Sequence, residues 1–294
     1  MDVIELRRGR TRAIVAPAAG GRLHQLEIDD GGDWLPLLHT APSPEALLDD
    51  SLHLGSYPMA PWPGRIDGGR FVWAGRQWSV PCNDPPHALH GRVAFAPWRI
   101  DAVSADACEL SIELDGSPFA GSVVQRIHVV DRGIDQRIEV RAARGSRFPA
   151  GAGWHPWFRR DVRPDAAVRV RVDASQVYET HEMIPTGWLL PARNEHDLRD
   201  GPELGDRRID ACYRHPRGPI SISWNDLTLT MASSPNVTHA VVFTPEHAAC
   251  VEPQTCAPDA FNLAAQGIEG AGMTIVSPVR PLIATTSWRW RSGR

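Results

Sequence analysis

The chain has 294 residues, 42% of them hydrophobic and 22% charged, and this apolar content over this length excludes a largely disordered protein. Its 31 basic residues stand against 35 acidic ones, for a formal net charge of −4, so the basic excess typical of nucleic-acid-binding proteins is missing. All basic residues are arginines. Without lysine, the chain cannot carry out Schiff-base catalysis on a lysine, anchor pyridoxal phosphate or form a Walker A phosphate loop.

Cysteine usage and the start of the chain indicate the compartment. An odd number of cysteines without a CxxC pair is typical of reduced thiols in a cytosolic protein. The first residues lack the basic and apolar regions of a secretory signal, and no apolar run reaches the roughly 18 to 20 residues of a membrane span. We therefore expect a cytoplasmic protein without membrane or nucleic-acid partners. The cysteines are Cys82, Cys108, Cys212, Cys250 and Cys256.

Apolar and polar side chains alternate along much of the chain, which is the period of strands with one buried face. Residues 123–130 and 136–140 flank the turn sequence Asp131-Arg132-Gly133, so this region predicts a β-hairpin. In chain order, strands are expected at residues 12–16, 71–73, 77–80, 107–114, 123–130, 136–140, 168–173, 220–224, 227–231, 240–243 and 283–290.

Helical periodicity is scarce. A helix is expected only over residues 44–52, where Ser43 is a candidate N-cap and Pro44 takes the first helical position. Residues 193–208 are polar and predict a long surface loop. Many short strands separated by Gly and Pro turns indicate an all-β sandwich or barrel, and we expect one domain over residues 1–294.

Three segments interrupt the strand pattern with Pro, Gly, Trp and ionisable residues: 58–70 continuing to 88–91, 151–158, and 243–245 with 251–262. In the second, His155 lies among aromatic residues and is either a packed core residue or a positioned acid/base. In the third, Glu252 precedes Pro253, which favours an extended backbone. A carboxylate at the end of a buried strand is either the partner of an arginine or a functional base.

The first segment carries Arg65 and His90. Arg65 is either a surface residue or a ligand-binding one, and His90 could simply hydrogen-bond a turn. His87 and His90 have HxxH spacing, but no other plausible ligands lie nearby, so we expect no metal site. The motifs GxSxG, GxGxxG and HExxH are absent, which removes the commonest hydrolase, dinucleotide-binding and zincin interpretations.

Taken together, these segments resemble the aldose 1-epimerase (galactose mutarotase-like) family over nearly the whole chain and in the family's order. The resemblance implies a large antiparallel β-sandwich with a cleft on one concave face, and interconversion of the α and β anomers of a free aldose without a cofactor. The matching stretches are Gly20-Gly21-Arg22-Leu23, Pro61-Trp62-Pro63-Gly64-Arg65-Ile66, Leu89-His90-Gly91, Gly153-Trp154-His155-Pro156-Trp157-Phe158, Val251-Glu252-Pro253-Gln254-Thr255 and Asp259-Ala260-Phe261-Asn262.

The resemblance also implies roles for individual residues. Glu252 corresponds to the family's general base and His155 to its general acid, while His90 and Arg65 correspond to sugar-binding residues. Asp210, in the short stretch Ile209-Asp210-Ala211-Cys212-Tyr213, corresponds to a sugar-binding aspartate. The implied partner is a small sugar, bound by a monomer or homodimer.

One position departs from the family pattern. The residue before the loop arginine is usually Asn in the family, but it is Gly64 here. The lost amide could alter recognition of a sugar hydroxyl, or the backbone could approach its neighbours as only glycine permits.

The residue types fit anomer interconversion independently of the resemblance. The reaction removes a proton from the anomeric hydroxyl and delivers one to the ring oxygen; the ring opens, the C1–C2 bond rotates and the ring closes again. Each positioned proton transfer contributes typically about 10²- to 10⁴-fold. This assignment requires Glu252 ionised and His155 protonated, a state that their mutual attraction is expected to favour.

Three alternatives remain at this stage. A glycoside hydrolase would need two carboxylates, such as Glu252 with Asp210. A non-catalytic carbohydrate-binding protein would bind sugar without needing Glu252. A hexose-6-phosphate 1-epimerase would need extra basic residues at the cleft, which Arg159-Arg160 and Arg207-Arg208 could supply.

Overall fold

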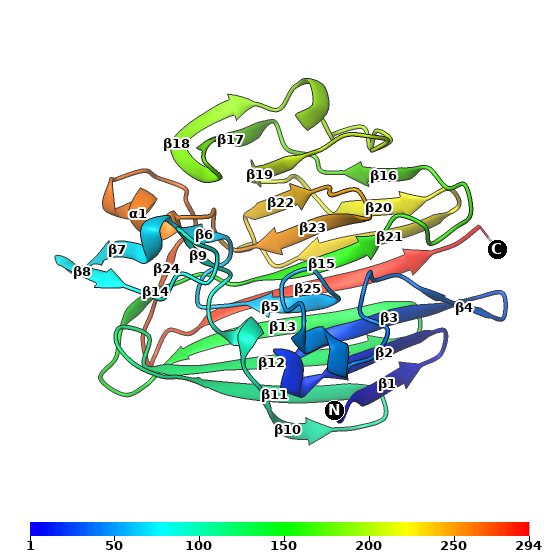
Figure 1. The fold of residues 1–294 in the computed structure, drawn as a ribbon, viewed down its shortest axis with the longest axis horizontal. Coiled ribbons are helices and arrows are strands. Elements are labelled where there is room, and N and C mark those ends of the chain that lie inside the picture. The colour runs from blue at the N-terminus through cyan, green and yellow to red at the C-terminus, as the bar shows by residue number, and fades with distance from the viewer. Residues whose placement is uncertain (294) are drawn as a thin grey trace.

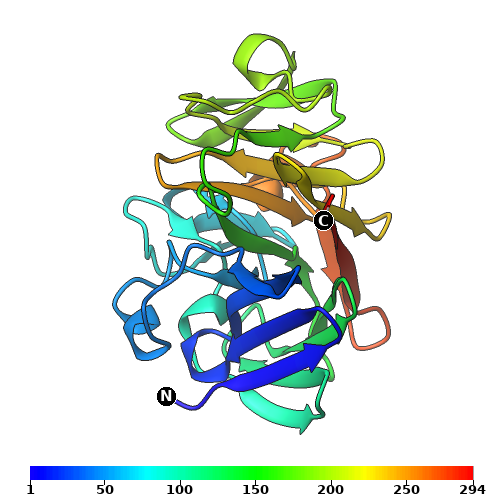
Figure 2. The ribbon, with the colours of Figure 1, turned by 90° about the vertical axis from the view of Figure 1, so that its right-hand side faces the viewer.

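The computed structural model describes residues 1–293 and consists mainly of two large antiparallel sheets packed against each other (Figures 1 and 2). The larger sheet has 11 strands; ten lie in the order β1-β2-β3-β5-β15-β23-β22-β19-β17-β18, and β4 pairs with β3. They are β1 (Ile4–Arg8), β2 (Thr11–Ala16), β3 (Arg22–Asp30), β4 (Asp33–Pro36), β5 (Ser56–Met59), β15 (Gly153–Arg159), β17 (Gln176–His181), β18 (Ile184–Pro191), β19 (Asp210–Arg214), β22 (His239–Phe243) and β23 (Ala248–Gln254).

The second sheet has eight strands in the order β10-β11-β12-β13-β25-β21-β20-β16. Three two-stranded ribbons, β14-β24, β6-β9 and β7-β8, complete the β structure. The bounds are β6 (Arg65–Ile66), β7 (Arg70–Trp73), β8 (Arg76–Ser79), β9 (Ala88–Leu89), β10 (Arg99–Val103), β11 (Ala107–Leu114), β12 (Gly121–Val130), β13 (Gly133–Ala142), β14 (Phe148–Ala150), β16 (Val168–Arg171), β20 (Ile220–Trp224), β21 (Leu227–Ser233), β24 (Thr274–Val276) and β25 (Leu282–Arg291).

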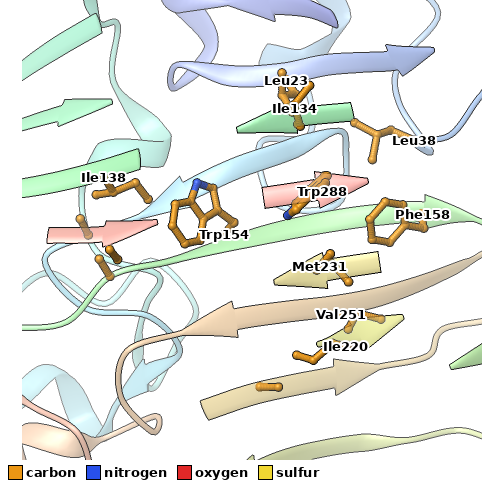
Figure 3. Close-up of a cluster of buried hydrophobic side chains, with 14 of the residues drawn as sticks. Leu23, Leu38, Ile134, Ile138, Trp154, Phe158, Ile220, Met231, Val251 and Trp288 are labelled. Carbon is orange, nitrogen blue, oxygen red and sulfur yellow. The ribbon is translucent and has the colours of Figure 1, made fainter. Parts of the chain in front are cut away.

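These sheets confirm the expected all-β sandwich. Each strand predicted from alternation is present within a few residues, and β12 and β13 form the predicted hairpin, with Val130 paired to Gly133. The apolar residues of both sheets meet in one buried core; Trp154, Phe158 and Val251 of the larger sheet lie near Ile138 and Trp288 of the smaller one (Figure 3).

The helix prediction is wrong in detail. Residues 44–52 contain only the short 3-10 helix η2 (Glu45–Leu48), where Pro44 is the N-cap and Ser43 makes no capping bond. The described residues contain one α-helix, α1 (Ala260–Ala265), which the sequence pattern did not reveal because six residues span too few turns to show a period. The other 3-10 helices are η1 (Pro17–Ala19), η3 (Asp67–Gly69), η4 (Val93–Phe95) and η5 (Asn194–His196).

The polar stretch 193–208 is mostly loop, as predicted, and contains η5. Within residues 1–293, no helix is both long and apolar enough to cross a membrane.

At the centre of the larger sheet, β5 and β15 were not predicted, and β23 was anticipated only as a buried strand ending at Glu252. Alternation marks a strand only when one face is exposed, but β5, β15 and β23 are buried almost throughout. Within β15, Trp154 and Phe158 pack into the sandwich core, whereas His155 and Trp157 point to the opposite face of the sheet. That opposite face forms the cleft described next.

Candidate active site

The register of the larger sheet aligns one residue from each of five adjacent strands. Cys212 of β19 pairs with Val241 of β22, which pairs with Glu252 of β23. His155 of β15 pairs with Tyr57 of β5 and faces Glu252, because the flanking pairs Gly153–Gln254 and Trp157–Cys250 fix the register of β15 and β23. This row crosses the middle of the sheet on the face away from the core.

A cleft of about 330 Å³ lies over this row. All five residues expected at the site, Glu252, His155, His90, Arg65 and Asp210, line it. The cleft is within the size range of small-molecule sites. Its other lining residues are Leu52, His53, Tyr57, Gly64, Asp84, Leu89, Trp157, Thr180, Met183, Pro185, Cys212, Val241, Phe243 and Pro258.

Glu252 and His155 form a buried pair. The distance from His155 Nε2 to Glu252 Oε1 is 3.3 Å, and the two residues are 2% and 4% exposed, Glu252 being the more buried. The other ring nitrogen, Nδ1 of His155, is buried without a hydrogen-bond partner among residues 1–293. A carboxyl and an imidazole this close can exchange a proton or act on one small molecule together.

Burial shifts both pKa values towards the neutral forms. Desolvation raises the pKa of Glu252 well above 4.5, and the nearby carboxylate of Asp210 adds to the shift. Desolvation lowers the pKa of His155 to about 3. The expected ionised pair is therefore not the state that this burial favours, because desolvation outweighs the attraction between the two charges. The pair nevertheless holds one proton in either form, on Glu252 or on His155.

Aromatic rings fix the His155 side chain. The Trp157 ring stacks parallel to the imidazole, with ring centroids 5.3 Å apart. The Tyr57 ring is tilted against the imidazole, with ring centroids 4.9 Å apart. The Tyr57 hydroxyl donates to the Leu52 carbonyl at 2.9 Å, and the Arg22 guanidinium lies over the Tyr57 ring. This packing leaves the His155 ring little freedom, as pre-organised proton transfer requires.

His90 is held by Gly64 through two reciprocal hydrogen bonds. The His90 N–H donates to the Gly64 carbonyl at 2.8 Å, and the Gly64 N–H donates to His90 Nδ1 at 3.2 Å. Burial lowers the pKa of His90 well below 6.5, so its imidazole is neutral at neutral pH. Because Nδ1 accepts a hydrogen bond, the ring proton is on Nε2, which can donate to a ligand.

The structure decides between the two explanations for Gly64. Its φ is 66°, and a Cβ atom there would lie 2.7 Å from Cβ and Cγ of Pro258. Such a contact is far inside van der Waals distance, so a side chain at this position would push the loop and Pro258 apart. The family's Asn does not fit beside Pro258 in this chain.

Replacing Gly64 with Asn is therefore expected to cost roughly 1–3 kcal/mol of stability and to displace His90. Gly68→Asn is the matched control, because Gly68 has φ 52° in the same loop with open space around its Cβ position. Urea unfolding of both variants checks this; equal stability losses would contradict the role of Pro258.

Arg65 enters the cleft from β6, which pairs with β9, so Arg65 lies opposite Leu89 and next to His90. Its guanidinium bonds the Asp84 carboxylate, with Nε at 3.0 Å and Nη2 at 2.9 Å from Oδ2. Asp210 is the first residue of β19, and desolvation raises its pKa. Two lining residues, Asp84 and Tyr57, were not among the expected site residues, whereas Trp157 stands in the His-Pro segment that marked the site.

The HxxH pair does not converge. His87 Nδ1 faces Asp67 Oδ1 at 3.3 Å, whereas His90 faces Gly64. Within the described residues, no group of three or more His, Cys, Asp or Glu side chains is arranged to hold a metal ion. The five cysteines are all free thiols.

The fold and the site define a β-sandwich protein with a buried carboxyl–imidazole pair in a small-molecule cleft. The aldose 1-epimerase family profile matches residues 2–278, and the chain belongs to this family. It is similar to the Escherichia coli K12 protein YihR, with 26% identity over 233 residues, which cover 71% of this chain and 72% of that protein.

Solved structures share the fold. A galactose mutarotase-like protein from Clostridium acetobutylicum superposes with a TM-score of 0.85 at 17% identity, covering 99% of this chain and 95% of that one. Galactose 1-epimerase from Lactobacillus acidophilus superposes with a TM-score of 0.80 at 15% identity, covering 100% and 96% of the two chains.

Proposed function

We propose that this protein is an aldose 1-epimerase that interconverts the α and β anomers of a free, uncharged aldose. The observation that carries the proposal is the buried Glu252–His155 pair, 3.3 Å apart in a cleft of small-molecule size. Membership of the aldose 1-epimerase family supports the same reaction.

In the proposed mechanism, Glu252 acts as general base on the anomeric hydroxyl and His155 as general acid on the ring oxygen. The proton of the resting pair is on Glu252, so its transfer across the 3.3 Å gap, or through the sugar, prepares the carboxylate and the imidazolium. The C1–O5 bond then breaks as the aldehyde forms, the C1–C2 bond rotates, and the two residues exchange roles as the ring closes on the other face.

Arg65, His90 and Asp210 bind the sugar in this proposal. The Nε2–H group of His90 donates to a sugar oxygen, and the guanidinium of Arg65 binds ring hydroxyls. Asp210, which also lines the cleft, accepts from a hydroxyl. None of these three residues needs to transfer a proton.

The charge of the cleft favours a neutral sugar over a sugar phosphate. Arg65 is the one arginine among the described residues lining the cleft, and Asp84 already pairs with it. Asp84 thus offsets the positive charge of Arg65, and no second arginine is left in the described lining to bind a phosphate. The partner facing Glu252 is an imidazole, which supports the epimerase over a two-carboxylate hydrolase.

Exchange spectroscopy by NMR tests the proposed function directly. The rate of exchange between α and β anomers is measured for glucose, galactose, pentoses and deoxy sugars, and for hexose 6-phosphates, with and without the protein. We expect acceleration for at least one neutral aldose and none for the phosphates. If only the hexose 6-phosphates exchange faster, the substrate is a sugar phosphate and not a neutral aldose. If sugar binds but no exchange is accelerated, the protein is a carbohydrate-binding protein and not an epimerase.

The pH dependence follows from the shifted pKa values. The pair holds one proton between the pKa of His155, about 3, and the raised pKa of Glu252. Below this range His155 takes up a second proton, and above it Glu252 loses the only one. We therefore expect kcat/KM at pH 4.5 to be within about twofold of its value at pH 6, after correction for spontaneous mutarotation. A decline between pH 6 and 4.5 would contradict the burial-shifted pair.

A further inference from the structure

The corner between β23 and α1 contacts the loop that carries Arg65. Asp259 in this corner donates its N–H to the Arg65 carbonyl at 2.7 Å, and its Oδ1 accepts the Asp67 N–H at 3.1 Å. Pro258, just before it, lies against Gly64. Two consecutive residues of the corner therefore contact the loop at Gly64, at Arg65 and at Asp67.

The Asp259 side chain accepts hydrogen bonds from this loop and from the Asn262 side chain, but not from the backbone N–H groups of its own helix. An Asp at an N-cap usually accepts hydrogen bonds from the first turn, but Asp259, the N-cap of α1, makes no side-chain capping bond. Its Oδ1 instead accepts from Asp67 and from Asn262 Nδ2, and the same Nδ2 also donates to the Arg70 carbonyl.

Both the burial of Asp259 and its backbone conformation are unfavourable for the free energy of folding. The residue is 5% exposed and has φ 54°, a left-handed conformation that Asn, Asp and Gly adopt most readily. Burial raises the pKa of its carboxyl to about 6, so at pH 8 the group is ionised and accepts hydrogen bonds. A buried carboxylate in a strained conformation is retained where its contacts offset the cost.

The contacts connect this corner to two of the proposed sugar-binding side chains, Arg65 of the loop and His90 beside it. Asp259 holds the backbone on either side of Ile66, which fixes the start of the Arg65 side chain. The same loop carries Gly64, whose two hydrogen bonds orient His90. The strand before the corner, β23, carries Glu252. The corner therefore fixes the position of the loop relative to the proposed general base.

We infer that Asp259 is a positioning residue that holds Arg65, and through Gly64 also His90, in place for the sugar. The inference rests on the proposed function for the identity of the ligand. It predicts that loss of the side-chain oxygen that accepts from Asp67 and Asn262 weakens sugar binding, while the Glu252–His155 chemistry of bound sugar continues.

Three variants separate this role from general stabilisation. Asp259→Gly removes the carboxylate and tolerates the left-handed φ, whereas Asp259→Asn keeps a carbonyl oxygen that can accept from Asp67 and Asn262. Asp165→Gly is the matched control, because Asp165 has φ 52° on an exposed turn outside the cleft lining.

Three readouts at pH 8 are compared: KM and kcat for mutarotation, the sugar Kd from tryptophan fluorescence, and hydrogen exchange of the peptide containing residues 64–67. For Asp259→Gly we expect KM and Kd to rise at least about fivefold with kcat within about twofold, and faster exchange in the loop. For Asp259→Asn we expect all three readouts to be close to the wild-type values, and for Asp165→Gly we expect the same.

The outcomes distinguish this inference from the proposed function. If no aldose is epimerised by the wild type, the proposed function fails, but sugar Kd and loop exchange still show whether Asp259 positions the loop. Unchanged Kd and unchanged loop exchange in folded Asp259→Gly would overturn the inference. So would a loss of kcat alone, or equal defects in Asp259→Gly and Asp259→Asn.

Discussion

Glu252→Gln is expected to lose at least about 10²-fold of the enzyme's acceleration of mutarotation, since an amide cannot take the proton of the anomeric hydroxyl. The substitution keeps the shape of a side chain that is 2% exposed, so sugar binding should persist. Polarimetry on freshly dissolved sugar measures the rate. Glu139→Gln is the control, because Glu139 is also buried but pairs with Arg137 and Arg141 in the other sheet.

The same variant should gain stability relative to the wild type as the pH rises. The folded-state pKa of Glu252 lies well above 4.5, so above pH 4.5 the unfolded chain releases a proton that the folded chain retains. Unfolding of the wild type is then favoured by about 1.4 kcal/mol per pH unit until the folded-state pKa is reached. The glutamine of the variant does not titrate and lacks this linkage. A stability difference between variant and wild type that is constant from pH 4 to 8 would contradict the raised pKa.

His155→Asn is expected to reduce mutarotation to a similar extent, because Asn fills part of the same space but cannot carry a proton between sugar oxygens. His239→Asn is the matched control: His239 is 1% exposed, burial also lowers its pKa to about 3, and it lies outside the cleft lining. Its variant should keep mutarotase activity.

The combination of the two active-site changes adds a further check. If Glu252 and His155 act as one acid/base unit, the double variant should be little worse than either single variant. Fully additive losses, or His155→Asn activity within about threefold of the wild type, would contradict a shared proton-transfer pair.

Many of the strands with one exposed face could be predicted from the sequence, and so could the sandwich class, although β1 was missed. β11 and the β12–β13 hairpin alternate apolar and polar residues, so their sequence shows which face is buried. The central strands β15 and β23 could not be recognised in this way, because both of their faces are covered. The catalytic candidates His155 and Glu252 lie on those two strands. These segments stood out by their Pro, Trp and ionisable residues and not by an alternation of apolar and polar residues.

The site residues were recognised through family motifs, but their relations required the structure. Sequence order gives no indication that Asp84 pairs with Arg65, or that Gly64 and Asp259 hold the cleft loop, since these contacts join segments far apart in the chain. The neutral state of the pair was also missed. Charge attraction could be anticipated from residue types, but the desolvation that outweighs it depends on burial.

The most direct test of the proposed pair is polarimetry on freshly dissolved α-D-glucose and α-D-galactose with wild type, Glu252→Gln and His155→Asn at equal concentrations. We predict that the wild type accelerates the approach to the equilibrium rotation and that both variants fall by about 10²-fold or more. Wild-type acceleration that survives in Glu252→Gln would contradict the assignment of Glu252 as the general base.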